Sequence, residues 1–112
     1  MDCVFCKIAN GEIPSKKAYE DDKVLAFYDL EPQAPVHVLI IPKEHIESAA
    51  MITPENSAIV AYIYEVAAKL AKELKLESGF RIVCNAGKDG GQTVPHLHFH
   101  LLGGRSMKWP PG

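Results

Sequence analysis

Three histidines dominate the chemistry that this sequence can offer: His96, His98 and His100 alternate with apolar residues in the run His-Leu-His-Phe-His-Leu-Leu. Alternation is the period of a β-strand, so the apolar side chains would face a core and the imidazoles would line the opposite face. Neighbouring histidines would stand about 6.6 Å apart, from a rise of about 3.3 Å per residue. Imidazoles have no packing advantage here and need hydrogen-bond partners when buried, so the row indicates a functional site.

Two kinds of chemistry fit such a row. The imidazoles could chelate one catalytic metal ion, because histidine is a good ligand for zinc and related metals. Alternatively, one histidine is a nucleophile or base and the others orient it. The preceding residues 87–93, Gly-Lys-Asp-Gly-Gly-Gln-Thr, favour the second interpretation, since such a loop exposes backbone N–H groups that suit an anionic oxygen.

Length and composition limit the classes of protein. The chain has 112 residues, 47% hydrophobic and 23% charged, which predicts one domain spanning residues 1–112. A net charge of −2 gives no case for binding nucleic-acid polymers or anionic membranes. No apolar run is long enough to cross a bilayer, and the N-terminus does not resemble a signal peptide. We therefore expect a cytoplasmic protein whose three cysteines are reduced.

The elements that must position the histidines can be predicted from pattern. We expect a short helix at 3–11, four strands at 16–20, 24–29, 36–41 and 80–85, and the histidine strand at 96–102. Thr53 and Pro54 predict the start of one long helix that ends near Leu76. Short connections between strands favour an α+β fold, in which a five-stranded antiparallel sheet is covered by the long helix on one face and open on the other.

Cys3 and Cys6 form a Cys-x-x-Cys pair in the short N-terminal helix and would lie on one face of it. The pair alone is ambiguous, because it suits a redox site, a metal clip or two small apolar residues. No βαβ pattern follows it, which weakens a thioredoxin-like interpretation.

With these residues in place, the sequence resembles a known family. Residues 91–104, Gly-Gln-Thr-Val-Pro-His-Leu-His-Phe-His-Leu-Leu-Gly-Gly, resemble the signature of the histidine-triad (HIT) superfamily of nucleotidyl hydrolases and transferases. The remaining matches look like its Hint branch, the nucleoside phosphoramidases, and they lie at residues 5–13, 25–29, 33–35, 41–43 and 109–112. The resemblance implies the same fold, with two protomers pairing into a ten-stranded sheet.

The resemblance also assigns catalytic roles. A neutral imidazole is a good nucleophile near pH 7, and it can attack phosphorus to form a phosphohistidine. His98 is central in the row, and it matches the histidine that becomes nucleotidylated on the α-phosphate. His100 matches a phosphate contact, and His37 matches a further histidine that supports the row. The Gln92 amide and the Thr93 hydroxyl would bind phosphate oxygens and the leaving group; the family more often has Ser at position 93.

Substrate-binding residues follow from the same resemblance. Asp29 matches an acid that binds both ribose hydroxyls, and Asn85 matches a polar group near ribose and phosphate. Backbone N–H groups around Gly91 would bind phosphate oxygens. Trp109 matches a tail residue that reaches the partner protomer's site. An apolar slot for the purine would be formed by Phe5, Ile8, Phe27 and Leu30.

The resemblance extends to a metal. Some members of the superfamily carry zinc at positions that match Cys3, Cys6, His45 and His96, which would form a closed Cys₂His₂ site. The zinc would be structural, and no catalytic cofactor is expected. The alternative is that both cysteines are free thiols and that His96 donates a structural hydrogen bond.

The function predicted from the sequence is therefore hydrolysis of the P–N bond in AMP-amine conjugates, or of acyl-AMP-type substrates, by a homodimer. One alternative is a dinucleoside polyphosphate hydrolase of the same superfamily. Another is a nucleotide-binding interaction module whose turnover is incidental.

Overall fold

The structure, a computed structural model, describes residues 3–112 and contains a five-stranded antiparallel sheet with strand order β1-β2-β3-β5-β4. The α+β prediction is thus confirmed. In chain order the elements are α1 (Val4–Ala9), β1 (Lys17–Glu20), β2 (Val24–Tyr28), β3 (Val36–Pro42), the 3₁₀ turn η1 (Ala49–Met51), α2 (Ala58–Glu73), β4 (Phe80–Val83) and β5 (Phe99–Gly103).

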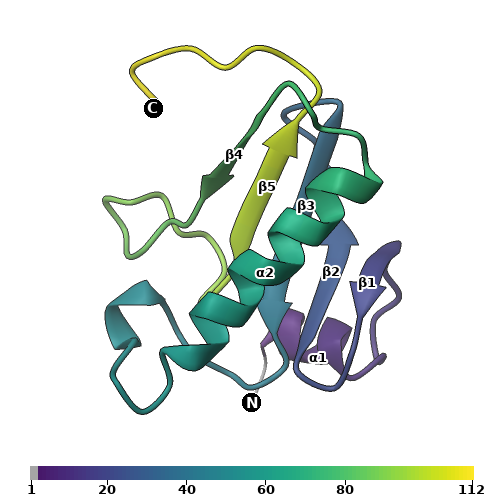
Figure 1. The fold of residues 1–112 in the computed structure, drawn as a ribbon. Coiled ribbons are helices and arrows are strands. Elements are labelled where there is room, and N and C mark those ends of the chain that lie inside the picture. The colour runs from purple at the N-terminus through teal and green to yellow at the C-terminus, as the bar shows by residue number, and fades with distance from the viewer. Residues whose placement is uncertain (1–2) are drawn as a thin grey trace.

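The two helices lie on opposite faces of the sheet (Figure 1). The buried stripe of α2, which includes Ile63 and Leu70, packs on one face against alternate residues of β3 such as Val38. The shorter α1 covers part of the other face, where Phe5 packs with residues such as Leu39. Burial of these apolar side chains is the main force that fixes both helices on the sheet.

The central strand β3 brings the histidines together. It pairs with β5 in a register that sets Leu39 opposite His100 and Val38 opposite Leu101. Side chains on directly opposed residues share a face of the sheet, so His100 lies on the face that carries α1, whereas Leu101 lies in the core under α2. The predicted division of imidazoles from apolar side chains is therefore confirmed for this strand.

The regular strand begins later than the sequence predicts. His96 and His98 precede β5, which starts at Phe99. The backbone N–H of His96 donates to the carbonyl of Val94 at 2.8 Å, and that of Leu97 donates to the carbonyl of Ile46 at 2.6 Å, outside the sheet ladder. These bonds lie outside the sheet ladder, so of the three histidines only His100 belongs to the regular strand.

The long helix also begins later than predicted. Residues 53–57 form turns in which Thr53 Oγ1 accepts from the N–H of Glu55 and the carbonyl of Thr53 accepts from the N–H of Ser57, and α2 starts at Ala58. It ends at Glu73 rather than near Leu76. Among residues 3–112, no helix is long and apolar enough to cross a membrane.

Candidate active site and metal centre

His98 is buried, and its ring is oriented by the main chain. Its Nδ1 lies 2.7 Å from the carbonyl oxygen of His96, which can only accept a hydrogen bond. Nδ1 therefore carries the proton, and in the neutral ring Nε2 keeps the lone pair. The ring of Phe5 meets the imidazole edge to face, with centroids 5.0 Å apart. The arrangement presents one imidazole nitrogen as a nucleophile.

His37 and His100 form a chain of hydrogen bonds with defined tautomers. The backbone N–H of Gln33 donates to His37 Nδ1 at 3.0 Å, so the proton of the neutral His37 ring lies on Nε2. His37 Nε2 lies 2.9 Å from His100 Nδ1, which must therefore accept. The proton of His100 is left on Nε2. This Gln33–His37–His100 chain ends in an N–H donor beside His98, whose ring centroid is 5.1 Å from that of His100.

The surroundings keep both members of this histidine pair neutral. Burial lowers the pKa of His37, and the Asp29 carboxylate, with Oδ2 3.5 Å from His37 Nε2, opposes the effect. Burial, together with the neighbouring His98 and His37 and against the opposing effect of Asp29, lowers the pKa of His100 to about 4. At pH 7 the imidazoles of His37 and His100 are therefore uncharged, as the tautomers above require.

Asp29, His37 and His100 also lie close enough to share a metal ion, with ligand atoms within 4.8 Å of one another. The hydrogen bond from the N–H of Gln33 argues against that use. Because Nδ1 of His37 accepts this bond, Nε2 could coordinate a metal only if it also lost its proton. The ring would then be an imidazolate anion. The group is suited to hold a proton.

Cys3, Cys6, His45 and His96 form a second cluster. His96 is fully buried, and its Nε2 lies 2.8 Å from the carbonyl oxygen of Pro42, so Nε2 carries the proton and Nδ1 has a lone pair. That lone pair faces three other ligand atoms. His96 Nδ1 is 3.3 Å from Cys3 Sγ, 3.5 Å from Cys6 Sγ and 3.2 Å from His45 Nδ1.

These separations fit one tetrahedral zinc ion. Bond lengths of about 2.3 Å to sulfur and about 2.05 Å to nitrogen place tetrahedral ligands about 3.6 Å apart for S···N and about 3.3 Å for N···N. The Pro42 carbonyl bonded to His96 is the usual outer partner of a ligating histidine. Burial lowers the pKa of His96 and raises that of the Cys6 thiol, and a bound cation would favour its thiolate.

The grouping of possible metal ligands argues against one hypothesis from the sequence, a catalytic metal ion chelated by His96, His98 and His100. Among residues 3–112, the groups that could hold a metal are the Cys₂His₂ set and the Asp29–His37–His100 set, and His98 belongs to neither. The three histidines of the motif do not converge on one ion. The four residues that the resemblance gives as zinc ligands lie together in one group that could hold the ion, which supports the predicted structural zinc.

The predicted purine slot is partly assembled. Phe5 and Phe27 meet edge to face with centroids 5.6 Å apart, and Ile8 packs against the same cluster. Leu30 does not join them, because its side chain is 97% exposed. Since Phe5 lies between Cys3 and Cys6, the segment that could hold a metal through two thiols also carries one wall of the predicted slot.

The glycine-rich loop is organised by Gln92. Its Nε2 donates to the carbonyls of Glu47 at 2.8 Å and Val94 at 3.0 Å, and its Oε1 accepts from the N–H of Gly87 at 2.9 Å. The N–H of Gly91 donates within the loop, to the carbonyl of Lys88. A Cβ at position 90 would lie 2.3 Å from the carbonyl oxygen of Ala86, so this turn requires glycine.

The remaining predicted residues lie at the rim. The exposed Thr93 follows the loop directly. Asn85 is half-buried two residues beyond β4, whose Val83 pairs with His100. Trp109 is 82% exposed in the C-terminal tail. In residues 3–112, none of the three is hydrogen-bonded to His98, so their roles stay predictions.

Sequence reasoning missed two functional positions that act through the main chain. The N–H of Gln33 fixes the tautomer of His37, and the carbonyl of Pro42 fixes that of His96. Neither role depends on the side chain. The available signals were the position of Gln33 in a Pro-rich loop four residues before His37 and the inclusion of Gln33 and Pro42 in stretches that match the family.

Comparison with known proteins agrees with the fold and the arrangement of histidines described above. The model of the HIT domain family matches residues 10–107. The chain is 50% identical over 111 residues to a 14 kDa zinc-binding protein of Zea mays, covering 97% of this chain and 87% of that one. It is 50% identical over 111 residues to an uncharacterised HIT-like protein of Synechococcus elongatus, covering 99% and 97%. A crystal structure of a HIT family hydrolase from Legionella pneumophila superposes with a TM-score of 0.97 at 52% identity, covering 99% and 100%.

Proposed function

Because this chain belongs to the HIT family, we propose that it is a nucleotide hydrolase of the Hint type that cleaves the P–N bond of purine nucleoside phosphoramidates, AMP joined to an amine, or acyl-AMP-type substrates. The observation that carries the proposal is the orientation of His98. Its Nδ1 is bound to the carbonyl of His96 at 2.7 Å, which leaves Nε2 as the nucleophile without help from an acid.

The reaction proceeds in two displacements. His98 Nε2 bonds to the α-phosphorus as the P–N bond breaks, and the amine leaves with a proton from the Thr93 hydroxyl, which regains one from the water of the second step. Water then attacks the same phosphorus, the bond to His98 breaks, and AMP is released. The Nε2–H of His100 donates to a phosphate oxygen, and His37 holds it in that tautomer. The Thr93 hydroxyl acts at the phosphate oxygens and the leaving group, whereas the Gln92 amide, which donates to the carbonyls of Glu47 and Val94, holds the loop in place.

Nucleotide binding uses the residues around this centre. The Asp29 carboxylate binds the ribose hydroxyls, with Asn85 and the loop at Gly91 near ribose and phosphate. The edge-to-face pair of Phe5 and Phe27 provides an apolar wall for the purine. The base would complete the slot against Ile8 and the exposed Leu30.

Zinc supplies a crosslink between α1 and the sheet when bound. Cys3 and Cys6 would hold it from the helix, and His45 and His96 from the segments that precede and follow α2. The residue that ligates through its side chain, His96, also orients His98 through its carbonyl. Reduced thiols are needed for this role, which is consistent with a cytoplasmic location.

The working unit in this proposal is a homodimer. Strand β4 is an edge of the sheet, and an uncovered edge can pair with a second copy. Phe80 on this strand is 44% exposed and Tyr64 of α2 is 49% exposed. Pairing of two β4 edges would give ten strands and bring Trp109 toward the partner's site. Light scattering at micromolar concentration should give twice 12.3 kDa, and a monomer would contradict the dimer.

The decisive experiment measures AMP release from an AMP-amine phosphoramidate. We expect His98→Ala to reduce kcat by at least about a thousandfold, because the variant has no nucleophile. AMP binding by calorimetry should be retained, which separates lost chemistry from lost folding. Equal rates in the wild type and the variant would overturn the mechanism.

The same assay separates the alternatives. A dinucleoside polyphosphate hydrolase would release AMP faster from diadenosine polyphosphates than from the phosphoramidate. A binding module would bind AMP without turnover of either substrate.

A further inference from the structure

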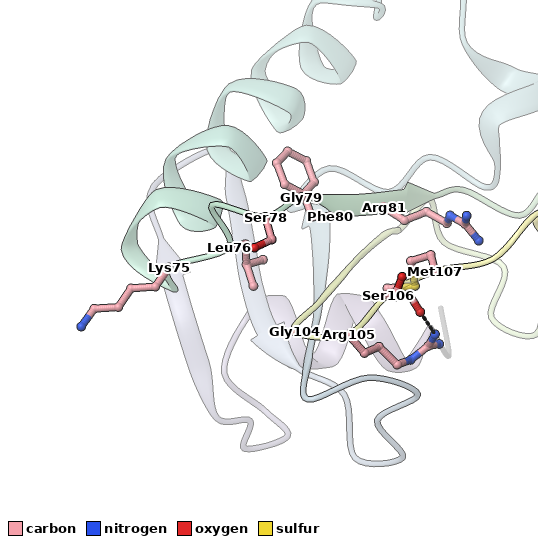
Figure 2. A pocket seen from close by; sticks show the side chains of 10 residues that line it. All are labelled: Lys75, Leu76, Ser78, Gly79, Phe80, Arg81, Gly104, Arg105, Ser106 and Met107. Carbon is pink, nitrogen blue, oxygen red and sulfur yellow. Dashed lines mark hydrogen bonds between the residues drawn. The ribbon is translucent and has the colours of Figure 1, made fainter.

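Arg105 lies two residues beyond β5, on the wall of a surface pocket of about 570 Å³. Figure 2 shows Arg81 and Arg105 on one side of this pocket, with Ser106 and Met107 between them in this view. Both guanidinium groups donate to backbone carbonyls. Arg81 donates to Lys108 at 3.0 Å, whereas Arg105 donates to Gln33 through Nε at 3.1 Å and through a terminal nitrogen at 3.0 Å.

The two arginines differ in the backbone segment that each guanidinium group holds. Arg81 holds the C-terminal tail. Arg105 holds the residue whose N–H donates to His37 Nδ1 and so fixes the tautomers of His37 and His100. An exposed guanidinium is therefore connected to the candidate active site by hydrogen bonds on either side of Gln33, whose backbone joins them.

Packing between the two segments supports this path. The β3–β5 ladder ends where Val36 pairs with Gly103, so the residues just before β3 and just after β5 remain adjacent. A Cβ at position 104 would lie 2.9 Å from Cβ of Pro35, which shows how closely the tail approaches the loop. The planar fork of Arg105 makes two charge-assisted bonds to a single carbonyl, a restraint that a lysine cannot reproduce.

We infer that Arg105 is a positioning residue for the hydrolytic site: by holding Gln33, it keeps the Nε2–H tautomer of His37 and thereby the Nε2–H donor of His100. The kinetic consequence rests on the proposed function, whereas the tautomers do not. Without Arg105, the hydrogen bond from the Gln33 N–H to His37 Nδ1 breaks in a fraction of molecules. In the same fraction the proton of His100 is no longer fixed on Nε2.

The first test is ¹⁵N NMR of the histidine rings in zinc-loaded protein at pH 7. Arg105→Met should move the Nδ1 and Nε2 shifts of His37 and His100 toward the average of the two tautomers. Arg81→Met is the matched control, because it removes an arginine from the same pocket, and it should leave those shifts unchanged. Wild-type shifts in Arg105→Met, or equal changes in both variants, would overturn the inference.

The second test is kinetic. With a phosphoramidate substrate, Arg105→Met should lower kcat about fivefold, the equivalent of about one net hydrogen bond, with little change in KM. Arg105→Lys should recover part of the loss, since it keeps a charged donor. A loss confined to KM would overturn the inference. If the wild type proves inactive, the proposed function fails while the NMR result still decides the role of Arg105.

Discussion

The two histidine clusters on either side of His98 are built alike and suited to different tasks. In each, a histidine of the triad motif meets a histidine from elsewhere through ring nitrogens: His96 meets His45 at 3.2 Å, and His100 meets His37 at 2.9 Å. In each, one main-chain group fixes a tautomer. The difference is that Pro42 supplies an acceptor and Gln33 supplies a donor.

That single difference decides what each cluster can hold. A carbonyl acceptor keeps the proton of His96 on Nε2, so the lone pair on Nδ1 faces two thiols and a second imidazole, as a metal requires. An N–H donor keeps the lone pair of His37 on Nδ1, so Nε2 directs a proton at His100. The same side chain therefore serves a cation or a proton according to its backbone partner.

The largest effect should come from breaking the metal cluster. We expect His45→Ala to lower zinc content well below one ion per chain and to lower Tm by at least about 10 °C, because a structural zinc contributes several kcal/mol to folding. Atomic absorption and calorimetry measure the two quantities. KM for the nucleotide should also rise, since α1 carries Phe5 on the same helix as the ligands. Unchanged zinc content and Tm would contradict the assignment of His45 as a ligand.

The matched change in the other cluster should have the opposite profile. His37→Ala should keep a full zinc equivalent while kcat for the phosphoramidate falls about a hundredfold, the low end of the range for a positioned proton donor, because His37 acts through His100. Both variants remove one histidine hydrogen-bonded to a triad histidine. If His37→Ala also lost zinc, or His45→Ala lost only kcat, the division of labour between the clusters would be wrong.

Much of this organisation was predictable from the sequence, and the reasons are physical. The period-two alternation around His100 and the helical stripe of α2 both reflect which side chains are buried. Burial can be predicted from the pattern of apolar and polar residues. The Cys-x-x-Cys pair alone was ambiguous, and it was the resemblance to the HIT superfamily that indicated the full Cys₂His₂ set. The segment around His96 was predicted as strand because its pattern alternates, but Pro95 and hydrogen bonds outside the ladder prevent regular pairing there.

What the sequence could not reveal lies in the backbone. The tautomers of His37 and His96 depend on whether a particular N–H or carbonyl points at the ring. Residue types do not determine which of these backbone groups faces a given side chain. The predicted cap at Thr53 failed for a related reason. Its hydroxyl accepts from Glu55, but Asn56 closes a tight turn by accepting from the Thr53 N–H, so the helix begins at Ala58.

The smallest effect that separates the clusters is the acid response of stability. Burial lowers the pKa of His100 to about 4, from an ordinary value near 6.5, so in mild acid the unfolded chain binds a proton that the folded chain does not. This group leaves the free energy of unfolding unchanged above about pH 6.5 and lowers it below that value. Integration over the interval from pH 6.5 to pH 5.5 gives a loss of about 1 kcal/mol.

Denaturant titrations of the wild type and His100→Asn across that interval isolate this contribution. Acid also weakens the zinc site, but His45 and His96 remain in both proteins, so their protonation cancels in the difference between the two curves. The gap between the curves should narrow by about 1 kcal/mol on acidification, because the variant lacks the group that resists protonation. Parallel curves would mean that His100 titrates alike in the folded and unfolded chains, which the buried chain of Gln33, His37 and His100 does not allow.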